Sequence, residues 1–173
     1  AAVAIVEGQH GARPGGRWQR VAPSWARGAR ARCGEPVAGR GQSVNVTWPV
    51  RVYVEDTDFG GVVYYANYLR WLERARTEWL RSKGLSQAAL ARDSGILFSV
   101  VSVQVNYRRP ARLDDELIIS CEPRADGRAS VRFVQQVLRG AELLADADVR
   151  VACLAASTLR PTRLPEFVIA EVG

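Results

Sequence analysis

The fold of this chain is decided by residues 55–68, which read EDTDFGGVVYYANY. An acidic cluster leads into two glycines, and the glycines lead into the start of a long amphipathic pattern. This order places a carboxylate, Asp58, in a loop that approaches the N-terminus of a helix. Unpaired backbone N–H groups and the positive end of the helix dipole gather there. Such a carboxylate can cap the helix, or it can act on a carbonyl that the helix amides polarise.

The pattern that follows predicts one long helix, from about Tyr64 to Lys83. Gly84 stands where a residue of left-handed conformation ends many helices. A helix of this size is about 27 Å long, enough to be the spine of a small domain. Ser86 is a good N-cap for a second, short helix that reaches Arg92. The apolar positions of the long helix recur with a 3.6-residue period at Tyr65, Tyr68, Leu69, Leu72, Ala75, Trp79 and Leu80.

Strands are expected on both sides of the helices. Alternating valines at positions 50, 52 and 54 predict one strand before the acidic loop. Four more follow in residues 96–107, 117–121, 131–137 and 143–155, with a hairpin at Asp126-Gly127 and an irregular C-terminus punctuated by two prolines. We therefore expect an α+β domain, in which a five-stranded antiparallel sheet, four strands of it in a meander, wraps around one buried helix. An exposed edge strand in such a sheet favours pairing between two subunits.

The positive charge of the chain lies mostly in its N-terminal part. The formal net charge is +6, and residues 1–47 hold seven arginines against two glutamates. The remainder is nearly neutral, which argues against nucleic-acid binding by the domain. Residues 1–45 are rich in Gly, Pro, Arg and Ala without periodicity, so we predict a disordered tail or the product of an upstream start assignment. The domain is expected over residues 46–173.

Cysteine and histidine usage excludes several chemistries. Cys33, Cys121 and Cys153 form no CxxC pair, so neither a disulfide framework nor a zinc site is predicted. Free thiols fit a reducing compartment, which favours the cytoplasm, and no apolar run is long enough for a membrane helix. The only histidine is His10. Its absence from the domain argues against Ser/His/Asp or Cys/His catalysis and against a metal site, so we expect no metal or cofactor.

Two interpretations of Asp58 remain open at this point. On position alone, a loop carboxylate next to a helix most often satisfies helix amides. A reactive role needs helix N–H groups aimed at a carbonyl and glycines, such as Gly60 and Gly61, that let a substrate approach. The dipole favours the ionised form, which suits a nucleophile or a base acting on water. Arg124 and Arg128 flank the Asp126-Gly127 turn, where they are either solvated or bind a phosphate.

These residues resemble the active-site pattern of the 4-hydroxybenzoyl-CoA thioesterase family. The pattern is Arg51-Val52, four residues, Thr57-Asp58, two residues, Gly61-Val62-Val63-Tyr64-Tyr65, one residue, and Asn67-Tyr68. The stretches WPVRVY (48–53), ERARTE (73–78) and PARLDD (110–115) are more narrowly similar to the Tol-Pal-associated acyl-CoA thioesterase branch. The likeness runs from Trp48 to about Glu171.

The resemblance implies a hotdog fold, assembled into homodimers or homotetramers with active sites between subunits. It places the catalytic aspartate on Asp58 and the amide that polarises the thioester carbonyl on the backbone N–H of Tyr65. Gly61, Tyr64 and Asn67 fall in the same motif and are expected to contact an acyl-CoA substrate, with Arg124 and Arg128 as candidates for its phosphates. Esters of acyl-carrier protein are the second substrate class.

The sequence thus predicts an acyl-CoA thioesterase that releases a free acid and CoA. A hotdog dehydratase is disfavoured, because that chemistry typically uses a histidine. The alternative of a different class is a non-catalytic acyl-CoA or acyl-carrier-protein binding module, or an adaptor of an envelope complex. Binding of an acyl thioester without turnover would favour that alternative.

Overall fold

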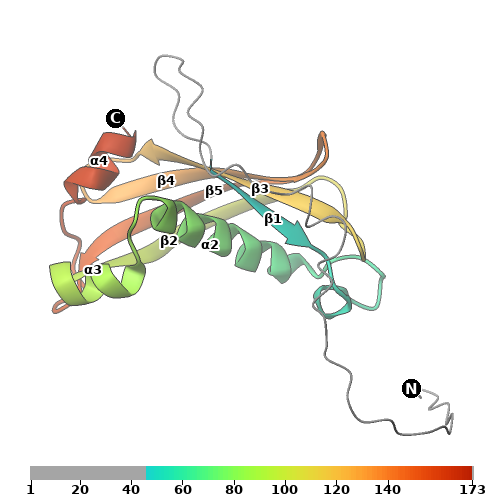
Figure 1. Cartoon of the computed structure of the whole chain (residues 1–173), viewed down its shortest axis with the longest axis horizontal. Helices are drawn as coiled ribbons and strands as arrows, with labels where there is room; N and C mark the ends of the chain where they lie inside the picture. Colours follow the sequence, from blue (N-terminus) through green and yellow to red (C-terminus); the bar gives the residue numbers. More distant parts are fainter. Residues whose placement is uncertain (1–45, 173) are drawn as a thin grey trace, which may run out of the picture. The chain divides into compact units, whose positions relative to one another are not determined.

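The structure, a computed structural model, describes residues 46–172. The tail predicted for residues 1–45 lies outside the described residues. The elements in chain order are β1 (Val46–Arg51), the 3-10 helix η1 (Val54–Asp56), α2 (Tyr65–Ser82), α3 (Gln87–Ser94), β2 (Ile96–Tyr107), β3 (Glu116–Ala125), β4 (Ser130–Arg139), β5 (Glu142–Ala155) and α4 (Glu166–Val172). Figure 1 shows α2 lying along one face of the sheet, with α3 and α4 at one end of it.

The five strands form one antiparallel sheet in the order β1-β3-β4-β5-β2. The predicted five-stranded α+β architecture is therefore confirmed, but the predicted four-strand meander is wrong in one respect. Only β3, β4 and β5 follow one another as hairpins, whereas β2 pairs with β5 and forms an edge. Sequence patterns give each strand's face but not its neighbours, because the pairing partner of a strand is set by tertiary packing.

The core lies between α2 and the sheet. The inward face of α2 carries Trp71, Leu72, Ala75 and Trp79, each at most 3% exposed. Strand alternation supplies the opposite wall, which includes Leu117, Ile119, Cys121, Val131, Phe133, Val137 and Val149. Alternation with a period of two puts these side chains on one face of the sheet. One helix is thus enough to cover the middle of the sheet.

The ends of α2 and α3 follow their sequence signals. Gly84 has a φ of +74°, and the amides of Gly84 and Leu85 donate to the carbonyls of Arg81 and Leu80. The Ser86 hydroxyl accepts the Ala89 amide at 3.2 Å and caps α3. Gly95 then ends α3 in the left-handed conformation. Gly84 and Ser86 were predictable because each has a local physical reason.

Two local predictions are wrong. The first strand ends at Arg51, and Val54, expected to continue it, lies exposed in η1, where the Asp56 carboxylate accepts the Tyr53 amide. The C-terminus is not irregular, because α4 forms after Pro165, whose carbonyl accepts the amides of Val168 and Ile169. Val168 is fully buried, so tertiary packing stabilises a helix of seven residues that would be marginal alone.

We expect Leu72→Ala to lower the free energy of unfolding by about 2–5 kcal/mol, because Leu72 is 1% exposed in the centre of the core. Leu113→Ala is the matched control, since Leu113 is 46% exposed and its change should be within about 0.5 kcal/mol. Urea unfolding at one fixed protein concentration measures both. Equal losses in the two variants would contradict the assignment of α2 as the centre of the core.

Candidate active site

The loop between η1 and α2 is closed by its own backbone. Thr57 and Val63 form an isolated antiparallel bridge, and the Asp58 amide donates to the Val62 carbonyl at 2.9 Å. The Gly61 amide returns to the Asp58 carbonyl at 3.0 Å, with Gly61 at a φ of +70°. A side chain at this φ is strained, so the turn requires glycine. The result is a short hairpin-like loop with Asp58 near its tip.

The Asp58 carboxylate is exposed and held in place by the loop. Its Oδ1 accepts the Gly60 amide at 2.7 Å. A Cβ added at Gly60 would lie 3.0 Å from the same oxygen, closer than side chains normally tolerate. A side chain at position 60 would therefore push the Asp58 carboxylate aside by a few tenths of an ångström. The N-cap of α2 is Tyr64, and no side chain of the described residues caps this helix, so Asp58 does not serve as its cap.

The start of α2 is fixed to the loop through one carbonyl. The Asp56 carbonyl accepts both the Tyr64 amide and the Asn67 side-chain amide, each at 2.9 Å. Asn67 is 7% exposed, so the described contacts give it a role in holding the loop, and substrate contact by Asn67 stays a prediction. Among residues 46–172 no acceptor is present for the Tyr65 amide, the first of the helix. That N–H is available to a ligand oxygen, and no acidic residue in the first turn competes for it.

Several tyrosine side chains lie at the start of α2. The Tyr107 hydroxyl, from the end of β2, donates to the Tyr65 carbonyl at 3.0 Å, and the Tyr64 and Tyr65 rings lie 4.7 Å apart. A hydrogen bond with Tyr65 raises the pKa of Tyr64, and the negative charge of Asp58 acts in the same direction. Burial raises the pKa of Tyr107.

A hollow of about 260 Å³ opens beside Tyr65. Tyr68, Tyr107 and Pro110 form much of its wall, together with Arg108 and Arg109. Both arginines are paired with carboxylates of β5: Arg108 contacts Asp146, and Arg109 lies 3.2 Å from Glu142. Sequence reasoning did not find Tyr107 as a site residue. It lies about forty positions from the motif, and only the return of β2 toward α2 could reveal it.

The structure brings together five of the seven predicted site residues and leaves two apart. Asp58, Gly61, Tyr64, Tyr65 and Asn67 lie in the loop and the first turn of α2. Arg124 and Arg128 lie at the opposite end of β3, whose first residue Glu116 pairs with Arg51 just before the loop. Eight residues of strand place Arg124 about 27 Å from that end. Arg124 pairs with Glu122 at 3.2 Å, and within one chain neither arginine belongs to the site around Asp58.

The geometry is that of a hotdog domain with a carboxylate loop at the start of its central helix. A family model described as the thioesterase-like superfamily matches residues 52–172. Among curated proteins, the chain is 45% identical over 125 residues to acyl-CoA thioester hydrolase YbgC of Escherichia coli O6:H1, which covers 72% of this chain and 92% of that protein. Acyl-CoA thioesterase YbgC of Haemophilus influenzae is 40% identical over 122 residues, which is 70% of this chain and 90% of that protein.

Solved structures agree with the fold. The crystal structure of a probable thioesterase from Bartonella henselae has a TM-score of 0.67 and 37% sequence identity, covering 70% of this chain and 99% of that chain. The chain therefore belongs to the thioesterase-like superfamily. It is an enzyme of the thioester hydrolase class with the predicted hotdog fold, which is confirmed. No helix among the described residues is long and apolar enough to cross a membrane.

We expect Gly60→Ala to lower the kcat/KM of thioester hydrolysis by about 10- to 100-fold, because the added methyl group would displace the Asp58 carboxylate. The free energy of unfolding should change by less than about 1 kcal/mol, since the loop is at the surface. Steady-state kinetics and urea unfolding on the same preparation separate the two effects. Full activity in this variant would show that the position of Asp58 does not matter for the reaction.

Proposed function

We propose that this protein hydrolyses acyl-CoA thioesters to a free carboxylic acid and CoA. The observation that carries the proposal is the unpaired Tyr65 amide at the start of α2, with the Asp58 carboxylate held in the adjoining loop. A thioester carbonyl that accepts the Tyr65 N–H would develop its negative charge at the positive end of the helix dipole. The printed names of the relatives, acyl-CoA thioester hydrolase and acyl-CoA thioesterase, support CoA as the thiol.

Asp58 can act by two routes. As a nucleophile, its oxygen attacks the thioester carbon, the C–S bond breaks, CoA leaves as a thiolate that takes up a proton, and water hydrolyses the resulting anhydride. As a general base, Asp58 takes a proton from water while the water oxygen attacks the same carbon. In both routes the oxyanion is stabilised by the Tyr65 amide. After single turnover in ¹⁸O-labelled water, label in the Asp58 carboxylate identifies the anhydride route with water attack at the Asp58 carbonyl carbon, because general-base catalysis places the label only in the released acid.

The site is completed by a second subunit in this proposal. The edge strand β2 is twelve residues long and exposes Val100, Val101 and Val103 at 48, 58 and 43%. A bare apolar edge of this length is a template for pairing, and a two-fold axis would pair β2 with its own copy in antiparallel orientation. A homodimer, or a homotetramer built from such dimers, follows. In such a dimer the partner's hairpin, which carries the positions of Arg124 and Arg128, lies toward the end of β2 where Tyr107 contacts Tyr65. This placement supports a phosphate-binding role for the two arginines.

The narrower branch and the compartment are also part of the proposal. The stretches WPVRVY, ERARTE and PARLDD, together with the YbgC relatives, support the Tol-Pal-associated branch. Free buried thiols at Cys121 and Cys153 support a reducing compartment, for which we propose the cytoplasm.

Asp58→Asn should lower kcat by at least ~10²-fold, and by more if Asp58 is the nucleophile. Thiol release from short aliphatic, long aliphatic and aromatic acyl-CoA esters, and from acyl-carrier-protein esters, measures this effect. Asp114→Asn is the control, because Asp114 is an exposed loop carboxylate whose side chain takes no part in the Asp58 loop. Normal turnover in a folded Asp58→Asn protein would end the proposed mechanism.

A Val101→Lys/Val103→Lys double variant should be monomeric in light scattering, because like charges would oppose each other across the paired edge. Loss of the partner should also lower kcat/KM by at least ~10-fold, since half of each site is removed. Ile118→Lys is the control: Ile118 is 37% exposed but lies on β3, which is paired on both sides. A dimer of unchanged stability in the double variant would place the interface elsewhere.

A further inference from the structure

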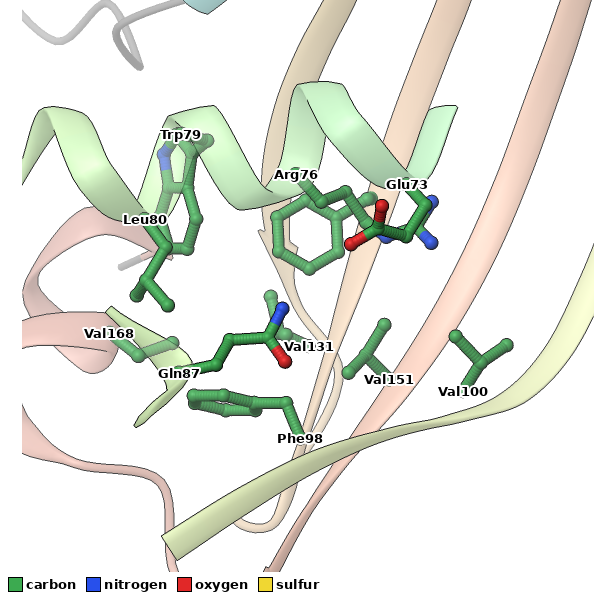
Figure 2. A pocket seen from close by; sticks show the side chains of 11 residues that line it. Glu73, Arg76, Trp79, Leu80, Gln87, Phe98, Val100, Val131, Val151 and Val168 are labelled. Atoms are coloured by element: carbon green, nitrogen blue, oxygen red, sulfur yellow. The ribbon is translucent and has the colours of Figure 1, made fainter. Parts of the chain in front are cut away.

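A second cavity, of about 150 Å³, lies beneath the C-terminal half of α2 (Figure 2). Its walls are mainly apolar and include Trp79, Leu80, Phe98, Val131, Phe133 and Val151. A cavity of this size and lining holds a group of about six heavy atoms, the size of a benzene ring. Figure 2 shows Glu73 and Arg76 near each other, well away from Trp79, Leu80 and Val168. The cavity is therefore an apolar chamber with charged groups on one part of its wall.

The two charged groups of this wall do not pair with each other. Glu73 and Arg76 are three positions apart on α2, the spacing of many helix ion pairs. The described residues contain no salt bridge between them, although the negative charge of Glu73 acts to raise the pKa of Arg76. Glu73 accepts a hydrogen bond from the Thr77 hydroxyl at 2.6 Å instead, and Gln87 donates to the same hydroxyl. The Glu73 carboxylate is thus held by a neutral neighbour on its own helix.

Arg76 is turned toward the sheet. Its Nη1 donates to the Gln135 side-chain oxygen at 2.8 Å, and the Gln135 amide donates to the Leu72 carbonyl at 3.0 Å. Gln135 is fully buried, so these two hydrogen bonds fix the guanidinium between α2 and β4. A guanidinium has five N–H donors, and within residues 46–172 one of them has a hydrogen-bond partner. Arg76 is half-buried, and its partial removal from water lowers the pKa of the guanidinium. A polar ligand atom would satisfy the remaining donors.

The cavity is distant from the Asp58 loop of its own chain. Arg76 follows Tyr65 by eleven residues of helix, a rise of about 16 Å. The wall of the cavity, however, includes Phe98 and Val100 at the beginning of β2, whereas the end of β2 at Tyr107 contacts Tyr65. Antiparallel pairing of two β2 edges sets the beginning of one strand beside the end of the other. In the dimer proposed above, the cavity of one subunit therefore lies beside the Tyr65 amide of its partner.

We propose that this cavity receives the acyl group bound at the partner subunit's Asp58, and that Arg76 selects acyl groups carrying a neutral oxygen acceptor, a hydroxyl or a carbonyl, about six carbons from the thioester. This inference rests on the proposed function and its dimer. The apolar walls take the carbon chain, and the guanidinium donates to the distal oxygen. Glu73, on the same wall, disfavours a distal carboxylate by like-charge repulsion and can accept a hydrogen bond from a distal hydroxyl. Arg76 is thus a specificity-determining residue of the hydrolysis reaction.

The test compares three esters of equal chain length: hexanoyl-CoA, 6-hydroxyhexanoyl-CoA and adipoyl-CoA. The wild-type protein should show a kcat/KM for the hydroxylated ester at least ~10-fold above that for hexanoyl-CoA, because a charged donor is otherwise left unpaired. Adipoyl-CoA should be slower than the hydroxylated ester. Arg76→Met should reduce the hydroxy-to-plain ratio to about one, and Arg76→Lys should keep an intermediate ratio. Ratios from one preparation cancel any loss of folded protein.

Arg74→Met is the matched control, since Arg74 is exposed and does not line this cavity, and its ratio should equal that of the wild type. A wild-type ratio near one, or a ratio that Arg76→Met leaves unchanged, overturns the role of Arg76 while the hydrolase proposal stands. Turnover of none of the esters by the wild type overturns the proposed function and this inference together. If Arg76→Met does not fold, the wild-type and Arg76→Lys ratios decide.

Discussion

One carbonyl oxygen, that of Asp56, fixes the geometry on which the candidate site depends. It accepts the Tyr64 amide and the buried Asn67 side chain, so the end of the acidic loop cannot move independently of the first turn of α2. The helix in turn is fixed by its core face against the sheet, through residues such as Leu72 and Trp79. Burial of that face therefore determines where the Tyr65 amide points, and the loop places Asp58 near it. The first turn of α2 is therefore held by the core and also carries the candidate site.

In the proposed mechanism the two ends of α2 have different roles. The N-terminal end offers an unpaired amide and a carboxylate, which suit a reaction at a carbonyl. The C-terminal half covers an apolar chamber with Arg76 at its wall, which suits recognition of an acyl group. Because β2 touches the first end with Tyr107 and the second with Phe98, its exposed edge is the element that could join the two functions across a dimer.

Much of the fold and of the candidate site could be predicted from the sequence, because the features concerned depend on neighbouring residues. The α2 stripe, the glycines at 61 and 84, and the Ser86 cap each follow from periodicity or backbone conformation, and the motif around Asp58 is contiguous. Tyr65 and Leu69, which the same period assigns to the stripe, are instead exposed. The position of β2 beside β5, the helix α4 and the contact of Tyr107 with Tyr65 were not, because they arise from tertiary packing between distant segments. The separation of Arg124 and Arg128 from the loop likewise depends on strand direction, which composition does not reveal.

A crystal structure of the protein with a CoA analogue, in which a methylene group replaces the thioester sulfur, would show directly how the site binds a carbonyl. We expect a ketone oxygen about 2.7–3.1 Å from the Tyr65 backbone nitrogen. We also expect the Asp58 carboxylate, or a water bound to it, to face the carbonyl carbon, and the acyl group to enter the partner's cavity. A ketone oxygen bound elsewhere, with Tyr65 and Asp58 free of the ligand, would rule out the proposed site.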